Sequence, residues 1–161
     1  MDCMKKRLEL FTIMEMKYDD SDVEYFKKLL KNDDYVIRTR ATCILADFGS
    51  KDLVKPIADV LQNDPNELVR HEAAFSLGQL SFTNAIKYLQ SATENDQSEF
   101  VRHEAAIALG VIGSNIAKQT LNKALNDVKR SVRESALIAL SNIEYVERLC
   151  HNKKFSKLVG G

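Results

Sequence analysis

One dipeptide, His-Glu, occurs twice in this sequence of 161 residues and is its best candidate for chemistry. The copies are His71-Glu72 and His103-Glu104. Imidazole and carboxylate together suit iron, and sites of two imidazoles and one carboxylate leave positions open for oxygen and a substrate. The same groups also bind zinc or manganese. If the fold brings the copies together, we expect the two imidazoles to bind one metal at about 2.0 to 2.1 Å from each nitrogen, by analogy with zinc, and Glu72 or Glu104 to complete the site.

Each His-Glu copy lies within a longer repeat. Four segments of the chain align with one another, and each has an arginine at the same place. The segments are VIRTRATCILADFG from Val36, LVRHEAAFSLGQLS from Leu68, FVRHEAAIALGVIG from Phe100 and SVRESALIALSNIE from Ser131. Apolar residues recur in each segment at i, i+4, i+8 and i+11, which is the spacing of a buried stripe on a helix. The segments recur with a period of about 32 residues, and periods of about 20 to 50 residues are typical of solenoids.

Shorter amphipathic segments alternate with the repeated ones, so each repeat is predicted to be a helical hairpin. They begin at Asp22, Asp52, Asn84 and Asn115. We predict one all-α domain over residues 1–161, a HEAT-like α-solenoid of about five helical hairpins. Residues 1–20 are expected to form an N-terminal capping helix, and residues 150–161 a C-terminal tail or cap. We interpret the recurrent arginines as making hydrogen bonds from repeat to repeat; they are Arg38, Arg70, Arg102 and Arg133.

The helical register places both dipeptides away from the apolar stripe. His71 follows the stripe residue Val69 by two positions, about 200° around a helix that turns about 100° per residue. His71 and Glu72 are therefore expected on an exposed face, and His103 and Glu104 likewise. Neighbouring solenoid helices pack about 8 to 10 Å apart, which is close enough for two imidazoles to reach one metal. The alternative is that duplication copied a solvated helix face with no ligand-binding role.

Gly78 and Gly110 follow the two histidines by nearly two helical turns, and so share their face. They either leave a shallow trough for a substrate beside the metal or act as packing spacers, because Ala46 and Ser141 at equivalent positions are also small. The segment from Gln62 to Glu104 carries seven acids against three bases. These acids either form an acidic trough that attracts a cationic substrate or stabilise the starts of helices.

Charge and cysteine content exclude several classes of protein. Lys plus Arg and Asp plus Glu each number 23, so the long-range field is weak and we expect no nucleic-acid or membrane binding. The longest apolar run, around Ala105 to Gly113, is too short to span a bilayer. The three cysteines are far apart with no Cys-x-x-Cys pair, so we expect a reducing, cytoplasmic environment.

The repeated motifs resemble those of deoxyhypusine hydroxylase, a family of HEAT-repeat enzymes. RHEAAFSLGQL, followed one repeat later by VRHEAAIALGVIG, is similar to one half of that enzyme, and the similarity covers roughly residues 52–149. The resemblance implies an O2-dependent di-iron monooxygenase that hydroxylates a modified lysine, deoxyhypusine, on the hypusine-containing translation factor. It also implies that His71, Glu72, His103 and Glu104 are iron ligands, because they match the ligand motifs of one half.

This chain contains half of the ligand set that the resemblance implies, since members of the family carry two halves, with four His-Glu motifs and two irons between them. A twofold homodimer presents each motif twice and restores the full set. We therefore expect a homodimer that assembles one site for two Fe ions. Two alternatives stay open. One is a non-enzymatic HEAT-repeat adaptor whose concave face binds a partner protein, and the other is a bilin-binding protein, because HEAT-like repeats also resemble those of phycobilin lyases.

Overall fold

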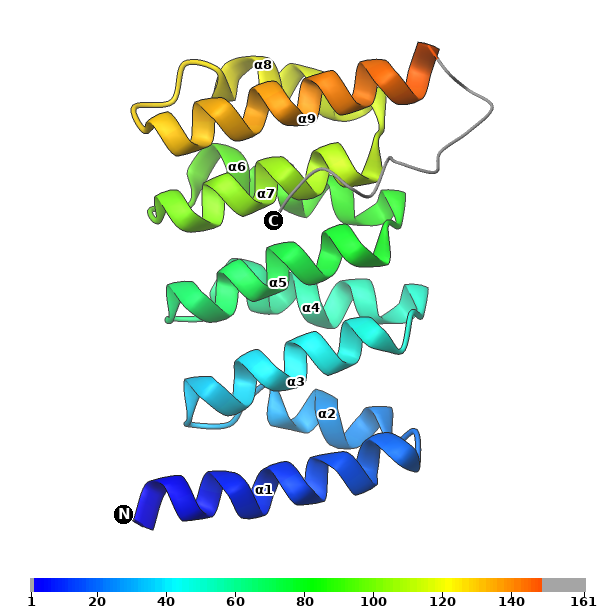
Figure 1. Cartoon of the computed structure of the whole chain (residues 1–161), viewed down its shortest axis with the longest axis vertical. Helices are drawn as coiled ribbons and strands as arrows, with labels where there is room; N and C mark the ends of the chain where they lie inside the picture. The colour runs from blue at the N-terminus through cyan, green and yellow to red at the C-terminus, as the bar shows by residue number, and fades with distance from the viewer. Residues whose placement is uncertain (1, 149–161) are drawn as a thin grey trace.

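The computed structural model describes residues 2–148, and helices make up its regular structure (Figure 1). They are α1 (Asp2–Asp19), α2 (Val23–Leu29), α3 (Tyr35–Asp47), α4 (Val54–Asn63), α5 (Glu67–Leu80), α6 (Ile86–Asn95), α7 (Glu99–Ile112), α8 (Lys118–Ala124) and α9 (Arg130–Arg148). Short 3-10 turns lead into α4, α6 and α8: η1 (Lys51–Leu53), η2 (Thr83–Ala85) and η3 (Asn115–Ala117). No strand occurs between residues 2 and 148. The predicted tail or cap at residues 150–161 lies outside the described residues.

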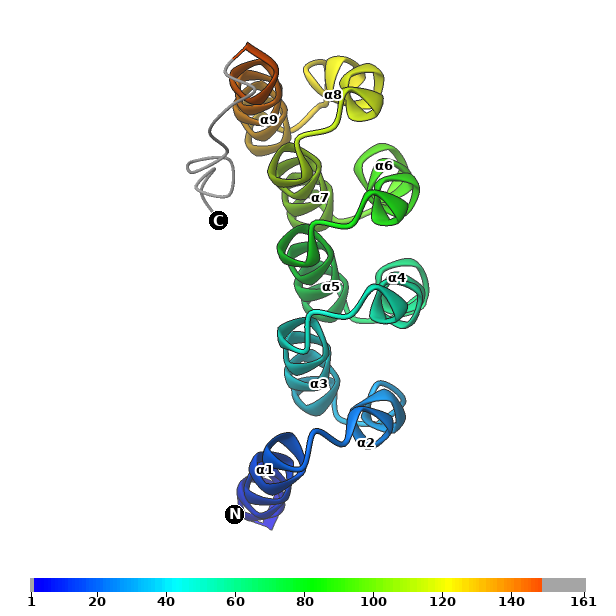
Figure 2. The ribbon, with the colours of Figure 1, turned by 90° about the vertical axis from the view of Figure 1, so that its right-hand side faces the viewer.

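The helices form two rows (Figure 2). We call α1, α3, α5, α7 and α9 the long-helix row, and α2, α4, α6 and α8 the short-helix row. Consecutive helices pair as hairpins from α2–α3 to α8–α9, and α1 adds a single helix at one end. The prediction of an all-α, HEAT-like solenoid is therefore confirmed, with a lone helix in place of a fifth hairpin. None of the helices within residues 2–148 is long and apolar enough to cross a membrane.

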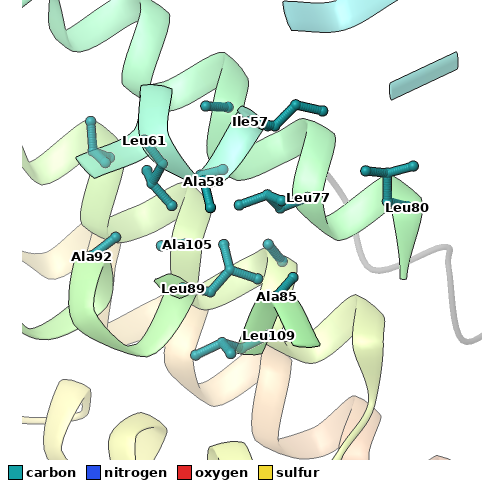
Figure 3. Packing of buried hydrophobic residues seen from close by; sticks show 14 of the residues in the cluster. Ile57, Ala58, Leu61, Leu77, Leu80, Ala85, Leu89, Ala92, Ala105 and Leu109 are labelled. Carbon is teal, nitrogen blue, oxygen red and sulfur yellow. The ribbon is translucent and has the colours of Figure 1, made fainter. Parts of the chain in front are cut away.

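A continuous apolar core fills the space between the two rows (Figure 3). Leu61 of α4, Leu77 of α5, Leu89 of α6 and Leu109 of α7 are all almost completely buried in it. Burial of one such side chain stabilises the fold by about 1.5 to 3 kcal/mol. The predicted stripes supply this core from the long-helix row, and their alanines, such as Ala105, let the helices approach closely.

A ladder of arginine-aspartate pairs ties each hairpin to the next. Nε and Nη2 of Arg70 donate to the two carboxylate oxygens of Asp96 at 2.8 and 2.9 Å. Arg38 makes the same two-bond contact with Asp64, and Arg102 makes it with Asp127. The predicted hydrogen bonds from repeat to repeat are thus present at these three arginines. Because Asp64 and Asp96 belong to the ladder, these two acids do not contribute to an acidic trough.

Candidate metal centre

The long-helix row brings the two His-Glu copies together, because α5 and α7 are neighbours in it (Figures 1 and 2). Each dipeptide lies near the start of its helix, so the two copies lie at the same level along the two neighbouring helices. One contact crosses from one copy to the other: Nε2 of His71 lies 3.5 Å from Oε2 of Glu104. The candidate ligand pair is therefore formed by residues of two repeats rather than by adjacent residues of one.

Glu104 is buried, which differs from the exposed face that the helical register predicts. Its side chain is 3% exposed, whereas that of His71 is 37% exposed. The reason is that α7 lies between two neighbours in the row, with α5 on one side and α9 on the other. Glu104 points into the contact with α5, so the neighbouring helix covers it. Within residues 2–148, no lysine or arginine pairs with this carboxylate.

Burial changes the acid-base properties of the site. It raises the pKa of Glu104 to about 7, and the nearby charge of Glu72 acts in the same direction. Burial lowers the pKa of His71, and a positive charge on His103 would lower it further. Both shifts favour uncharged groups, because a low-dielectric site with no counter-charge disfavours either ion. A bound divalent cation would reverse this preference at the carboxylates.

Glu72 faces the preceding repeat as well as the site. The thiol of Cys43, on α3, lies beside Glu72. Burial raises the pKa of Glu72, and the adjacent thiol partly opposes that shift. The repeat pattern gives no signal for Cys43, because apolar residues, Phe75 and Ile107, occupy its position in the next two repeats.

His103 makes the contact that corresponds to that of His71, one repeat further along. Nδ1 of His103 is within hydrogen-bond distance of Oγ of Ser135, on α9. Ser135 occupies the position in its repeat that Glu104 occupies in the preceding one. The row therefore offers a carboxylate partner to His71 and a hydroxyl partner to His103. The sequence alone gives no signal for this contact, because the register of Ser135 becomes informative only once the contact between His71 and Glu104 is known.

The expectation of an open trough at Gly78 and Gly110 is wrong. Both glycines are buried. A Cβ atom added to Gly78 would lie 2.9 Å from Cβ of Ala108, and one added to Gly110 would lie 2.7 Å from both Cα and Cβ of Ala139. The next helix of the row fills the space that the missing side chains leave. The two glycines are packing spacers, which allow α5, α7 and α9 to approach one another closely.

Comparison with known proteins agrees with this architecture. A family model described as HEAT repeats matches residues 54–141. This chain belongs to the HEAT-repeat family. Its fold is also similar to the solved structure of human deoxyhypusine hydroxylase in complex with glycerol, with a TM-score of 0.74 and 26% sequence identity. A search of curated proteins finds no match.

The alignment with the human enzyme covers 88% of this HEAT-repeat chain and 49% of the human one. The chain thus spans about half the length of that relative. The resemblance inferred from the repeated motifs is confirmed by this structural similarity.

The donor set of this HEAT-repeat protein fits a divalent metal in part. Two donor atoms that each lie about 2.1 Å from one ion are separated by about 3.0 to 3.5 Å. The distance of 3.5 Å between Nε2 of His71 and Oε2 of Glu104 is within that range. However, the described residues of one chain contain no group of three or more His, Cys, Asp or Glu side chains that could hold an ion. A metal bound by His71 and Glu104 would therefore need donors beyond those that residues 2–148 of one chain bring together.

Proposed function

We propose that this HEAT-repeat protein is an O2-dependent di-iron monooxygenase that hydroxylates a protein-bound lysine derivative of the deoxyhypusine kind. His71, Glu72, His103 and Glu104 would serve as its metal ligands, with two Fe ions in each assembled site. The observation that carries the proposal is the convergence of His71 and Glu104 across α5 and α7, at a distance that suits one shared ion. The similarity to human deoxyhypusine hydroxylase supports the choice of iron and of substrate class.

A second copy of the chain would complete the site. Twofold symmetry would present each ligand twice and supply donors in addition to those of residues 2–148 of one chain. Exposed apolar side chains support such an interface: Leu68 is 55% exposed and Phe100 is 57% exposed. Each lies three residues before a histidine, on the same side of its helix. Burial of these side chains around the metal ligands would stabilise a dimer and exclude water from the site.

The roles of the protein groups follow from their positions. His71 would offer Nε2, the atom that faces Glu104, and Glu104 would offer a carboxylate shielded from water by α5. Glu72, which lies near enough to raise the pKa of Glu104, would help to neutralise the positive charge of the metal. Bound ferrous iron would supply the activation of O2, which amino-acid side chains do not provide. The half-exposed His71 would mark the side from which a substrate lysine reaches the site.

The decisive experiment starts with anaerobic loading of the purified protein with Fe²⁺. Light scattering with metal analysis should find a dimer with about two Fe ions. Addition of O2 and a deoxyhypusine-bearing protein, the hypusine-containing translation factor, should then add one oxygen atom to the substrate by mass. A His103→Ala variant provides the inactive control. A monomer that binds no iron would refute the proposal.

A non-enzymatic adaptor is the second candidate, favoured by the lack of a three-donor group within residues 2–148 of one chain. In that case the exposed apolar residues Leu68 and Phe100 would contact a different protein. The same loading experiment separates the two functions, because an adaptor stays colourless and iron-free. For either function we propose a cytoplasmic location, since three widely spaced cysteines suit a reducing compartment.

A further inference from the structure

Ser135 lies where a carboxylate ligand lies one repeat earlier, yet it is not itself a good metal ligand. Ser135 is almost fully buried on α9, where its side chain contacts His103 of α7. Its Oγ takes part in two hydrogen bonds, one with Nδ1 of His103 and one with the backbone carbonyl of Ser131, at 2.8 Å. A buried hydroxyl with two defined partners has little freedom to rotate, so the direction of its proton is determined by those partners.

The hydrogen-bond count assigns the tautomer of His103. A serine hydroxyl has one proton to donate and lone pairs to accept with. The carbonyl of Ser131 can only accept, so the hydroxyl of Ser135 donates its proton there. Oγ of Ser135 must then accept from His103, which requires a proton on Nδ1. In a neutral imidazole a proton on Nδ1 leaves the lone pair on Nε2.

We infer that Ser135 is a positioning residue that holds His103 as the tautomer protonated at Nδ1, which leaves the lone pair of Nε2 available to bind a metal. The consequence for metal binding rests on the proposed function, whereas the tautomer does not. Free imidazole side chains in water favour a proton on Nε2, so the contact with Ser135 selects the less common form. A fixed tautomer and ring orientation raise the affinity of a histidine for a metal.

The contrast with His71 explains why the partner of His103 is a serine and not a carboxylate. His71 directs Nε2 at Glu104, so its partner on the next helix is a candidate ligand for the same ion. His103 directs Nδ1 at Ser135, so its partner on the next helix orients the ring instead. The same contact between neighbouring helices therefore has two uses, and the change from Glu104 to Ser135 marks the edge of the proposed site along the row.

The first test measures the tautomer in the metal-free protein. Long-range ¹H–¹⁵N spectra of ¹⁵N-histidine-labelled protein above neutral pH distinguish the protonated ring nitrogen from the bare one. Wild type should show His103 protonated at Nδ1, and Ser135→Ala should shift the ring toward a mixture of tautomers. Ser135→Thr keeps the hydroxyl and should restore the wild-type pattern. Wild-type protein with the proton on Nε2, or a Ser135→Ala spectrum identical to wild type, would overturn the inference.

The second test titrates Fe²⁺ under anaerobic conditions by calorimetry. Ser135→Ala should bind Fe²⁺ about 10- to 100-fold more weakly than wild type, and Ser135→Thr should recover most of the affinity. Thr93→Val is a matched control, because Thr93 is also buried and its hydroxyl also donates to a backbone carbonyl four residues earlier, at 2.8 Å. Thr93 lies on α6, in the short-helix row, and its variant should bind Fe²⁺ as wild type does.

The two tests separate failure of this inference from failure of the proposed function. Wild-type protein that binds no Fe²⁺ refutes the proposed function, and the tautomer spectra still decide the role of Ser135. Equal Fe²⁺ affinity of wild type and Ser135→Ala, in a protein that does bind iron, refutes the positioning role.

Discussion

The same residue type has different surroundings in the two His-Glu copies. Glu104 is buried, with Nε2 of His71 3.5 Å from its carboxylate, whereas Glu72 lies beside Cys43 at the contact with α3. A carboxylate that is buried without a cation is costly, because desolvation disfavours its charge. A bound cation would offset this cost, and this is the residue-level support for the proposed metal centre.

Replacement of His71 by alanine should separate metal binding from folding. We expect His71→Ala to weaken Fe²⁺ binding by more than about 100-fold, since it removes a proposed ligand. The free energy of unfolding should change by less than about 1 kcal/mol, because the side chain is 37% exposed and lies off the core stripe. Calorimetric titration and urea denaturation measure the two effects. Gln79→Ala, on an exposed position of the same helix, is the control for both. Cooperative destabilisation by several kcal/mol would show a structural role instead.

Close approach of neighbouring helices is the feature that positions the site at the level of elements. Gly78 and Gly110 allow α5, α7 and α9 to pack with almost no space between their backbones. The arginine-aspartate ladder sets the register of one hairpin against the next. A shift of one helix along its neighbour would separate His71 from Glu104, so packing and ladder together determine the geometry of the donors.

A methyl group at Gly110 should disturb this packing. Gly110→Ala places a Cβ atom 2.7 Å from Cα and Cβ of Ala139, so a helix must move. We expect a loss of about 1 to 3 kcal/mol in the free energy of unfolding, despite the higher helix propensity of alanine. Ser141→Ala, at the equivalent but exposed position of α9, should change it by less than about 0.5 kcal/mol. Chemical denaturation would contradict the spacer role if Gly110→Ala were as stable as wild type.

The ladder should make the protein sensitive to acid. The Arg102 guanidinium beside Asp127 holds the pKa of that carboxyl below its ordinary value of 3.8. A lowered folded-state pKa stabilises the fold above pH 3.8, and this stabilisation is lost as the pH falls through the folded-state pKa. Asp127→Asn should therefore cost about 1 to 2 kcal/mol at pH 7 and progressively less below pH 3.8.

Denaturation curves at pH 7 and pH 3 measure this difference. Asp59→Asn is the control, because Asp59 forms an exposed pair with Lys55 one helical turn away. Exposed pairs of this kind contribute little, so the control should match wild type within about 0.5 kcal/mol at both pH values. An Asp127→Asn deficit that does not shrink at pH 3 would contradict the assignment to ionisation.

The described part of the chain is a short stack of repeats. One face of the long-helix row packs on the short helices, and the other face points away from them (Figure 2). This face carries the candidate ligands and the exposed residues Leu68 and Phe100. The chain spans about half the length of human deoxyhypusine hydroxylase. In the proposed function a second copy facing the first would surround the ligands, which links the stoichiometry of the protein to its metal binding.

A charge introduced on this face should abolish both the proposed dimer and its iron binding. Leu68→Asp should convert the proposed dimer to a monomer at micromolar concentration, because it buries an unpaired carboxylate in the interface. Iron content should fall with the dimer fraction, although Leu68 is not a proposed ligand. Ile116→Asp, at a residue that is 68% exposed and lies in η3, before α8 of the short-helix row, is the matched control. Light scattering combined with metal analysis tests both, and a Leu68→Asp dimer with full iron content would contradict the interface.

The sequence by itself determined the repeat, the helical hairpins and the ladder arginines, because a core stripe has a regular period and each repeat packs in the same way on the next. It also identified His71 and His103 as outside the core stripe. Only the tertiary structure decided that His71 meets Glu104, that Ser135 meets His103, and that the glycines are spacers. These features depend on which side chains face each other across two helices. The position of a residue on its own helix does not determine which residue of the neighbouring helix it contacts.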